Sequence, residues 1–496
     1  MRSIALGSVL LAALLSWWVL RADVGPATGT GYTLTVHCAA GIKGPVTKAA
    51  KEYEQQFGNR VELTFGGSGA LLSALTVRNH GDIYIAGDDS YVSDAKQRGL
   101  VAEILALASM RPVIAVRSGN PKNITSYRDL LRLDVRTGLG NPEAAAVGKI
   151  AKRVATDLGF WDQLRDKVTV MKPTVNDLGN DLQIGTIDAA VIWDATVRQY
   201  ENLEIIEDPQ LSRQARNVTL GVLRCTTQPR PALHFARYLA AHDRGLLVFS
   251  AEGFTPIDGD EWADVPQLEL MSGAMLRPAI DSTVTAFEQR EGVRVNRVYN
   301  GCGILVSQMK TGSIPDAYFS CDQTFLDQVQ DRFQDGVTVT ANDVVMLLRK
   351  GNPKNIAKLR DLLRPGVRVG LGHPEKSALG ALTTGLLSRT GHLDNLKASG
   401  NVVVESATGD LLVNQITAGS LDVVLVYRSN TAHVGERCEV APIQEATSQA
   451  RQPFAIAKDS AHPHLMRRLL DTLRGADSRR RFEELGFHWR DGERPK

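Results

Sequence analysis

The stretch RSGNPKNITSYRDLLRLDVRTGLGNPEAAAVG, residues 117–148, returns later in the same chain as RKGNPKNIAKLRDLLRPGVRVGLGHPEKSALG, residues 349–380. At a constant shift of 232 positions, 21 of these 32 residues are identical, including all of GNPKNI. Before and after this stretch the shift is 234: FGGSGALLSAL (65–75) aligns with YNGCGILVSQM (299–309), and GTIDAAVIW (185–193) with GSLDVVLVY (419–427). Solenoid repeats run to only 20–50 residues. The chain therefore contains two copies of one complete domain.

The repeat divides the chain into parts. We predict an N-terminal segment over 1–30, a first domain over 31–254, a linker over 255–266 and a second domain over 267–490. Within each copy, short apolar runs alternate with helix-like stretches. In the first copy, YTLTVHCAA, RVELTF and DIYIAG are typical of strands, and helices are expected over 45–57 and 70–78. A second series follows, with helices over 146–158 and 177–184, so each domain is predicted to be α/β with two lobes, each a sheet flanked by helices.

Overall composition argues for a globular protein without a nucleic-acid partner. Hydrophobic residues make up 43% and charged residues 23% of the chain, and the formal net charge is +2. Nucleic-acid binding requires a concentrated basic face, which this balance does not indicate. No Ser/His/Asp or Cys/His arrangement recurs in both copies. We therefore expect a binding protein rather than an enzyme, and no cofactor.

The N-terminal segment predicts export. Arg2 precedes the uncharged run IALGSVLLAALLSWWVL, residues 4–20, and Arg21 ends it. Seventeen apolar residues stand at the lower limit for crossing a bilayer, where about 20 are usual. The run is either a signal peptide or an uncleaved anchor in the cytoplasmic membrane, and both place the rest of the chain in a periplasmic or extracytoplasmic compartment.

Glycine-rich junctions between strands and helices predict an anion site. In the first copy they are AAG (39–41), GGSG (66–69) and the segment 140–148, all at the carboxyl ends of predicted strands. Ligands of open α/β sheets bind at that edge. Glycine lets backbone N–H groups approach a guest closely, and helix N-termini carry partial positive charge. Because these loops contain almost no Lys or Arg, neutral dipoles would meet the charge, which suits a dehydrated oxyanion.

These same motifs carry a resemblance. CAAG before a helix, FGGSG, GDIYIAGDDSYV, GNPE and DAAVIW, in this order and spacing, resemble the periplasmic molybdate-binding proteins, which are substrate-binding subunits of ABC importers. The resemblance covers each copy almost end to end. It implies a tandem duplication of the type II periplasmic-binding fold. It also implies capture of molybdate, tungstate or a similar tetrahedral oxyanion between two lobes, and delivery to an ABC transporter permease.

The resemblance also implies site residues, copy by copy. Two family serines fall on Gly41 and Ser68 in the first copy and on Met275 and Cys302 in the second, so only Ser68 is kept. Backbone N–H donors and a family tyrosine complete the set. These positions are Val147, Val175 and Trp193 in the first copy, and Leu379, Gly409 and Tyr427 in the second.

Sulfur atoms leave further alternatives open in the second copy. Met271, Met275, Cys302 and Cys321 map to strand ends or loops that face the predicted cleft. They could be core residues with a Cys302–Cys321 disulfide, they could place a thiol against an oxyanion, or they could hold a soft metal such as Cu(I). A membrane-tethered sensor or scaffold, whose clefts recognise a ligand without passing it on, is the competing function.

Overall fold

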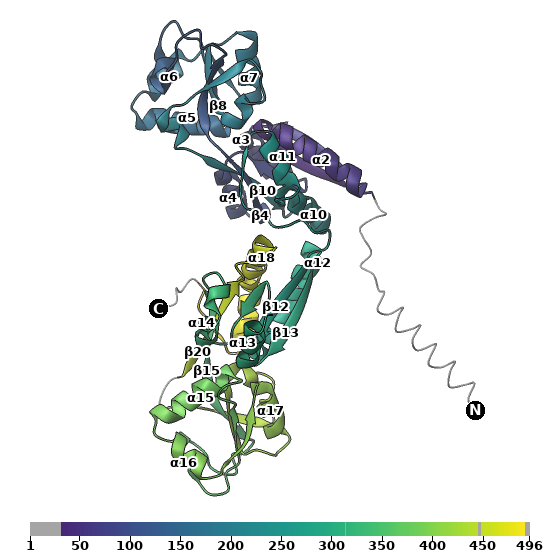
Figure 1. Ribbon diagram of the computed structural model, residues 1–496, viewed down its shortest axis with the longest axis vertical. Coiled ribbons are helices and arrows are strands. Elements are labelled where there is room, and N and C mark those ends of the chain that lie inside the picture. Colours follow the sequence, from purple (N-terminus) through teal and green to yellow (C-terminus); the bar gives the residue numbers. More distant parts are fainter. Residues whose placement is uncertain (1–30, 313, 445–447, 492–496) are drawn as a thin grey trace, which may run out of the picture. The chain divides into compact units, whose positions relative to one another are not determined.

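The computed structural model describes residues 31–312, 314–444 and 448–491. These fall into two compact units, Met1–Ile257 (unit one) and Asp258–Lys496 (unit two), each with its own sheets and helices (Figure 1). The predicted signal or anchor over 1–30 lies outside the described residues. Within the described ranges, no helix combines the length and the hydrophobicity needed to cross a bilayer.

Lobe one of unit one is built on a six-stranded sheet in the order β11-β4-β10-β3-β1-β2. Its strands are β1 (Thr33–Ala39), β2 (Arg60–Gly66), β3 (Ile83–Ala86), β4 (Val101–Met110), β10 (Arg216–Leu223) and β11 (Thr255–Pro256). β1 runs parallel to β2 and β3, and parallel neighbours need crossover helices. The helices are η1 (Ala40–Ile42), α2 (Lys43–Phe57), α3 (Ser68–Arg78), α4 (Asp89–Gln97), α10 (Pro229–Ala240) and α11 (Gly245–Ala251).

Lobe two of unit one has a five-stranded sheet in the order β7-β6-β8-β5-β9. Its strands are β5 (Pro112–Arg117), β6 (Thr137–Gly140), β7 (Val170–Lys172), β8 (Ala189–Trp193) and β9 (Leu203–Ile206). Its helices are η2 (Tyr127–Leu131), α5 (Ala146–Asp157), α6 (Trp161–Lys167), α7 (Val175–Ile184), α8 (Asp194–Val197) and α9 (Pro209–Ser212). Helices α5 and α7 pack on β6 and β8 (Figure 1), so the predicted α/β lobe with helical cover is confirmed.

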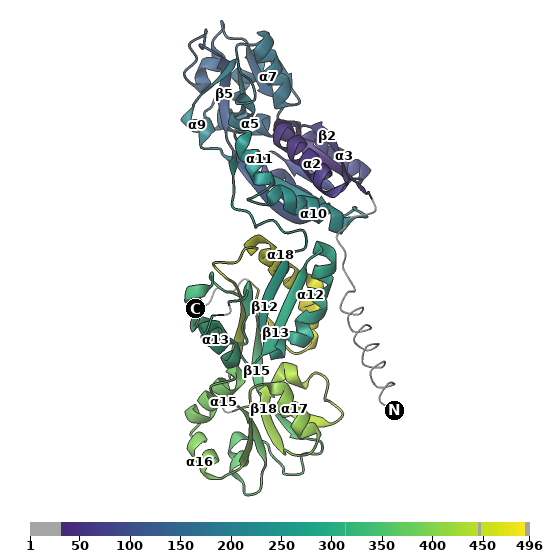
Figure 2. The same cartoon turned by 45° about the vertical axis from the view of Figure 1, so that its right-hand side comes forward.

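Unit two repeats this plan with one continuous sheet, in the order β13-β12-β14-β20-β15-β18-β16-β17 (Figure 2). Strands β19 and β21 pair with β15 beside this path. The strands are β12 (Gln267–Gly273), β13 (Arg294–Asn300), β14 (Ala317–Phe319), β15 (Val337–Arg349), β16 (Val369–Gly372), β17 (Val402–Ser406), β18 (Val423–Tyr427), β19 (Cys438–Pro442), β20 (Gln449–Ile456) and β21 (His488–Trp489). The helices are η3 (Ala274–Leu276), α12 (Arg277–Glu291), α13 (Cys302–Lys310), α14 (Gln323–Asp327), η4 (Gln330–Arg332), η5 (Leu359–Leu363), α15 (Ala378–Arg389), α16 (Leu393–Ala398), α17 (Gly409–Thr417), η6 (Arg428–Thr431), α18 (Pro463–Leu473) and α19 (Ala476–Glu484).

One residue explains why unit one has two sheets and unit two has one. In unit one the chain leaves lobe one after Met110 and starts β5 at Pro112, which has no N–H to donate to a ladder. At the corresponding place in unit two, Val344 donates its N–H to the carbonyl of Ser448 at 3.0 Å. Strand β15 therefore runs unbroken through both lobes.

Three helices of unit one begin two residues before their predicted starts. They start at Lys43, Ser68 and Val175 instead of 45, 70 and 177, whereas α5 starts at Ala146 as predicted. At α7 the cause is a cap, because the Thr174 hydroxyl accepts the N–H of Asp177 at 3.3 Å. The consequence is functional. Residues taken for loop lie in the first turns of helices, where amide N–H groups have no carbonyl partner within the helix.

Candidate functional site

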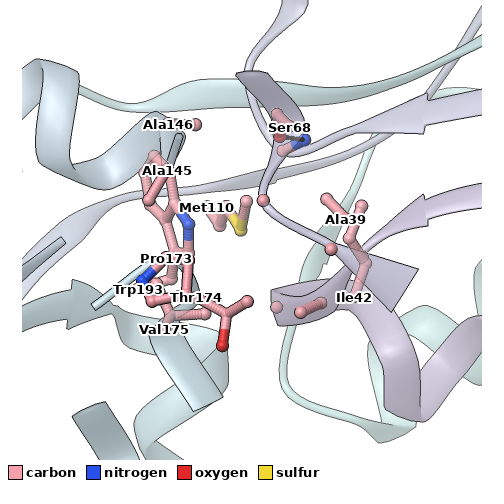
Figure 3. Close-up of a pocket in the computed structure, with 15 residues that line it drawn as sticks. Ala39, Ile42, Ser68, Met110, Ala145, Ala146, Pro173, Thr174, Val175 and Trp193 are labelled. Carbon is pink, nitrogen blue, oxygen red and sulfur yellow. Dashed lines mark hydrogen bonds between the residues drawn. The ribbon is translucent and has the colours of Figure 1, made fainter. Parts of the chain in front are cut away.

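A small pocket lies between the two lobes of unit one. Its cavity volume is about 20 Å³. If the radius of a sphere of that volume is increased by the ~1.4 Å radius of a water molecule, the resulting radius is roughly 3 Å. One inorganic oxyanion has about this radius. Figure 3 shows lobe-one residues facing lobe-two residues across it. The lining residues are Ala39, Ala40, Gly41, Ile42, Gly66, Gly67, Ser68, Gly87, Met110, Ala145, Ala146, Pro173, Thr174, Val175 and Trp193.

No residue that lines this pocket is charged, and helix starts surround it. The lining includes residues of η1, which leads into α2, and the first or preceding residues of α3, α5 and α7. These helices have 15, 11, 12 and 10 residues, so each presents several amide N–H groups and the positive end of its dipole. The pocket therefore faces the positive ends of helix dipoles and no cationic side chain.

The position of Ser68 leaves its hydroxyl proton available to donate a hydrogen bond to a ligand. Its side chain is 3% exposed, and its Oγ accepts the N–H of Gly87 at 3.2 Å. No other hydrogen bond of this hydroxyl occurs in the described part of the chain. Because the oxygen accepts from Gly87, the O–H is left to donate, and a donor in this position complements an anion.

Beside the pocket, a backbone hydrogen bond joins the two lobes. The N–H of Gly69 in lobe one donates to the carbonyl of Ala144 in lobe two at 3.0 Å. A Cβ on Gly67 would meet the same carbonyl and lie 2.6 Å from the carbonyl oxygen of Pro173. Glycine at 67 is thus required by the close approach of lobe two.

Gly41 stands where the resemblance implies a serine, and its surroundings explain the exchange. A Cβ on Gly41 would lie 2.9 Å from Val175 Cγ2 and 3.3 Å from Trp193 Cδ1. These two side chains fill the room that a serine would need. In unit two the corresponding residues are Met275, Gly409 and Tyr427. Compared with unit one, unit two has a larger residue at the first of these positions and smaller residues at the other two. The three positions therefore change together.

Sequence reasoning found part of this site. Gly41, Ser68, Val175 and Trp193 line the pocket, together with Ala145 and Ala146. Val147, the predicted backbone N–H donor, is the second residue of α5, and its side chain is fully buried. Reasoning also missed Gly87, Met110 and Thr174. Gly87 and Met110 follow or end strands of lobe one, a signal available in the sequence. Their approach to Ser68 and Trp193 arises only from packing.

Unit two carries a disulfide at the equivalent place. Cys302 and Cys321, the counterparts of Ser68 and Gly87, form a disulfide with a Cα–Cα separation of 6.4 Å. The disulfide is thus confirmed among the alternatives for these sulfur atoms. Met275 lies in η3, Cys302 and Gly409 begin α13 and α17, Leu379 is the second residue of α15, and Tyr427 ends β18.

The disulfide also bears on metal binding. Both Cys302 and Cys321 are consumed in it, so neither is a thiolate ligand in this state. The other three cysteines, Cys38, Cys225 and Cys438, are free. Across the described residues, no three or more His, Cys, Asp or Glu side chains are grouped to hold a metal ion.

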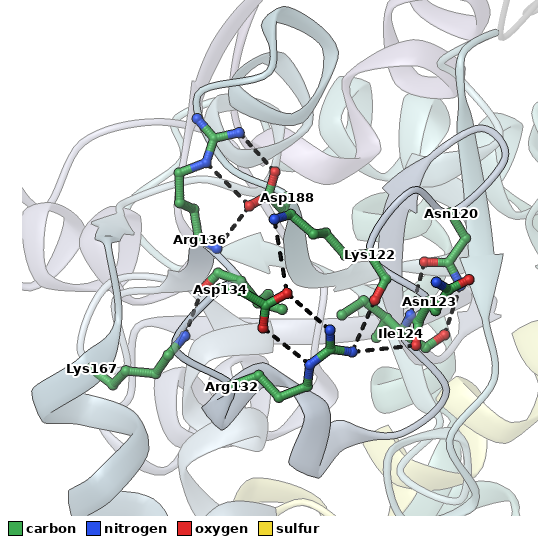
Figure 4. Close-up of polar contacts among 10 residues, drawn as sticks. Asn120, Lys122, Asn123, Ile124, Arg132, Asp134, Arg136, Lys167 and Asp188 are labelled. Atoms are coloured by element: carbon green, nitrogen blue, oxygen red, sulfur yellow. Dashed lines mark hydrogen bonds and ion pairs between the residues drawn. The ribbon is translucent and has the colours of Figure 1, made fainter.

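The duplicated GNPKNI is a turn outside this pocket. Gly119, Asn120 and Asn123 have positive φ of 81°, 43° and 49°, a conformation that glycine and asparagine tolerate best. The Asn120 amide bonds both the N–H and the carbonyl of Ile124, at 2.9 and 2.8 Å (Figure 4). Asn352 and Ile356 repeat both bonds in unit two. This geometry indicates a structural role for the turn, near the start of lobe two.

A buried carboxylate near this turn makes stability depend on pH. Asp188 accepts the backbone N–H of Arg136 at 2.9 Å and its guanidinium at 2.7 and 3.1 Å (Figure 4). Burial alone would raise the pKa of Asp188, but these hydrogen bonds outweigh it and hold the pKa below its usual value. The carboxylate therefore stabilises unit one above the unfolded pKa of about 3.9, and this contribution is lost as the pH falls through the lower folded value.

We expect Asp188→Asn to lower the free energy of unfolding of unit one at pH 7 by about 1 kcal/mol, since Arg136 is half exposed. The difference from wild type should shrink at pH 2. Urea titrations monitored by hydrogen exchange in α5 and β8 measure it, with the exposed Asp162→Asn as the control. A difference of equal size at both pH values would contradict the role of the carboxylate.

Comparison with known proteins agrees with the two-fold organisation. A family model described as bacterial extracellular solute-binding protein matches residues 34–255 and again 268–488. A binding protein of Haemophilus influenzae is 31% identical over 224 residues, covering 45% of this chain and 91% of its own. The molybdate-binding protein ModA of Mycobacterium tuberculosis is 28% identical over 201 residues, covering 40% and 74%.

Solved structures also align over about half of the chain. The periplasmic molybdate-binding protein of Azotobacter vinelandii, 16% identical, covers 45% of this chain and 100% of its own, with a TM-score of 0.41. The sulfate-binding protein SubI of Mycobacterium tuberculosis, 20% identical, covers 46% and 88%, also at 0.41. Because the family model matches both units almost end to end, the chain belongs to the bacterial extracellular solute-binding proteins and carries two domains of that family in tandem.

Proposed function

We propose that unit one binds a tetrahedral oxyanion of the molybdate type in its interlobe pocket, for delivery to an ABC transporter permease. One observation carries the proposal: helix starts and the Ser68 hydroxyl converge on a small pocket with no charged lining residue. Such a pocket offers donors and dipoles to a small anion and gives nothing to a cation. The relationship to ModA proteins suggests molybdate or tungstate as the first ligands to test.

The strength of binding follows from the donors. Hydrogen bonds to a charged group contribute roughly 1.5–3 kcal/mol each. A few of them, less several kcal/mol for the lost freedom of the guest, give a dissociation constant near the micromolar range. Such affinity suits capture and release, and it needs no catalytic group.

Replacing the Ser68 hydroxyl tests the site. We expect Ser68→Ala to weaken molybdate binding about 10- to 100-fold, because one charge-assisted hydrogen bond is removed. Isothermal titration calorimetry of the full chain with molybdate, tungstate and sulfate measures this. Ser73→Ala, an exposed position on the same helix, is the matched control. Equal affinity for wild type and Ser68→Ala would refute the assignment of this pocket.

We further propose that the protein works outside the cytoplasm, held or released by residues 1–30. The family description and the apolar run over 4–20 support this placement. Mass spectrometry of the N-terminus from membrane and soluble fractions distinguishes an anchored protein from a free shuttle. An intact N-terminus in the membrane fraction favours the anchor, and with it the tethered sensor as an alternative to a carrier.

A further inference from the structure

Strand register fixes which residues of unit two stand at the pocket positions of unit one. Met110 and Trp193 line the pocket in unit one. Two pairs of facing residues locate their counterparts. Pro112 faces Trp193 in unit one as Val344 faces Tyr427 in unit two. Met110 faces Arg216 in unit one as Asn342 faces Ala450 in unit two. Asn342 and Tyr427 therefore occupy the positions of Met110 and Trp193.

Both side chains are buried, and among the described residues their polar atoms have no hydrogen-bond partner. Asn342 is 0% exposed, and within the described residues neither its Nδ2 nor its Oδ1 has a partner. The Tyr427 hydroxyl is in the same state, in a side chain 3% exposed. Each unmet buried polar group costs about 1–3 kcal/mol. Native structures avoid that cost with water, an ion or a ligand, so these groups indicate a guest.

The amide defines the chemistry of that guest. Whichever way the Asn342 amide is turned, one donor and one acceptor stay unmet. A fully deprotonated oxyanion such as molybdate can only accept hydrogen bonds. A protonated oxyanion accepts from Nδ2 and donates its own O–H to Oδ1, so it satisfies both atoms. Met110 in unit one places no such pair beside its pocket.

Charge around the position points the same way. In unit one Asp88 pairs with Arg216 at 3.4 Å. Its counterpart in unit two, Asp322, has Ala450 in place of that arginine. Burial raises the pKa of Asp322, and this carboxyl acts electrostatically on Tyr427. Because Asp322 lacks the arginine partner that Asp88 has, the site beside it favours a ligand of lower negative charge. Protonation of an oxyanion lowers its negative charge in this way.

The disulfide also changes which groups of unit two can donate a hydrogen bond to a ligand. In unit one the N–H of Gly87 meets the Ser68 hydroxyl, whereas in unit two the N–H of Cys321 meets Cys302 Sγ at 3.1 Å. Cys302 has no proton to donate. Donors in unit two therefore come from Asn342, Tyr427 and the first turns of α15 and α17.

We propose that unit two binds a protonated tetrahedral oxyanion, of which hydrogen phosphate is the simplest, through Asn342 and Tyr427. This deepens the proposed function and rests on it in treating the interlobe position as an anion site. The two units then select different protonation classes: unit one takes the fully deprotonated anion, and unit two takes the anion that keeps a proton.

Equilibrium binding of radiolabelled inorganic phosphate to the full chain, with and without saturating molybdate, tests this. We expect one phosphate per chain that molybdate does not displace. Asn342→Met, which restores the residue of unit one at similar volume, should weaken phosphate binding at least 10-fold and leave molybdate binding unchanged. Tyr427→Phe, a change that removes only the hydroxyl, should weaken phosphate binding about 3- to 10-fold. Asn395→Met, at an exposed position of α16 in the same unit, is the matched control.

Three results would overturn the inference: no phosphate binding, one-for-one displacement of phosphate by molybdate, or phosphate binding unaffected by both variants. The third result would mean that Asn342 binds only buried water. Hydrogen exchange of β15 in each variant verifies that unit two is folded, and Tyr427→Phe remains informative if Asn342→Met is not. Molybdate binding that fails while phosphate binding follows this pattern would reject the function proposed for unit one and support this one.

Discussion

Gly67→Ala should abolish tight oxyanion binding by unit one while leaving the unit folded. An added Cβ would meet the backbone carbonyls of Ala144 and Pro173 in lobe two, and these oxygens cannot turn aside as a flexible side chain would. The backbone at Gly67 has φ −69° and ψ 144°, which alanine adopts without strain. The methyl group therefore penalises only the approach of the lobes.

We expect at least 100-fold weaker molybdate binding, corresponding to about 3 kcal/mol. Calorimetry measures the loss, and the thermal midpoint without ligand should stay close to that of wild type. Gly31→Ala is the control outside the pocket, because the nearest atom to its Cβ would be the Gly58 carbonyl oxygen at 3.7 Å, an ordinary van der Waals contact. A Gly67→Ala protein that binds molybdate within three-fold of wild type would show that lobe contact at this point is not part of binding.

Glu291→Ala should produce the largest loss of stability in unit two. Glu291 and Arg468 form a bidentate ion pair, with Nε–Oε1 and Nη2–Oε2 distances of 2.7 and 3.1 Å, and their side chains are only 2% and 10% exposed. Removing Glu291 takes this carboxylate away from the buried guanidinium of Arg468, which costs about 3–5 kcal/mol. Urea titration with hydrogen exchange read from α12 and α18 measures the change.

Two further variants sharpen this test. Glu483→Ala removes the exposed partner of Arg479 on α19 and should change the free energy of unfolding by under about 1 kcal/mol. The double variant Glu291→Leu with Arg468→Met should recover most of the loss, because it removes both charges. If Glu291→Ala costs no more than Glu483→Ala, the buried pair contributes nothing beyond a surface contact.

Unit one uses different chemistry at the same place, which shows how far the copies have diverged. There Phe57 and His234, the counterparts of Glu291 and Arg468, pack edge to face, and His234 shares a hydrogen bond of 2.7 Å with Tyr53. An ion pair in one copy and an aromatic contact in the other both fill the space between a helix of the N-terminal part and one of the C-terminal part. The fold tolerates either because both satisfy their polar atoms.

The sequence predicted which residues line the pocket better than how these residues fit together. Gly41, Ser68, Val175 and Trp193 line the pocket, and each lies where a strand ends or a helix begins. Their mutual fit was not predictable. That Val175 and Trp193 occupy the space of a side chain at Gly41 is a consequence of contacts between segments more than 130 residues apart.

The sequence by itself determined the duplication, the α/β class and the two lobes, because hydrophobic periodicity is a local property of the chain. It also placed glycine-rich junctions at the strand ends beside which the pocket lies. Only the tertiary structure decided that the Cys302–Cys321 disulfide forms in place of the Ser68–Gly87 contact. It alone showed that Asn342 is buried with both amide atoms unmet. Hydrogen bonding and disulfide formation depend on distances between residues remote in sequence, and folding alone sets those distances.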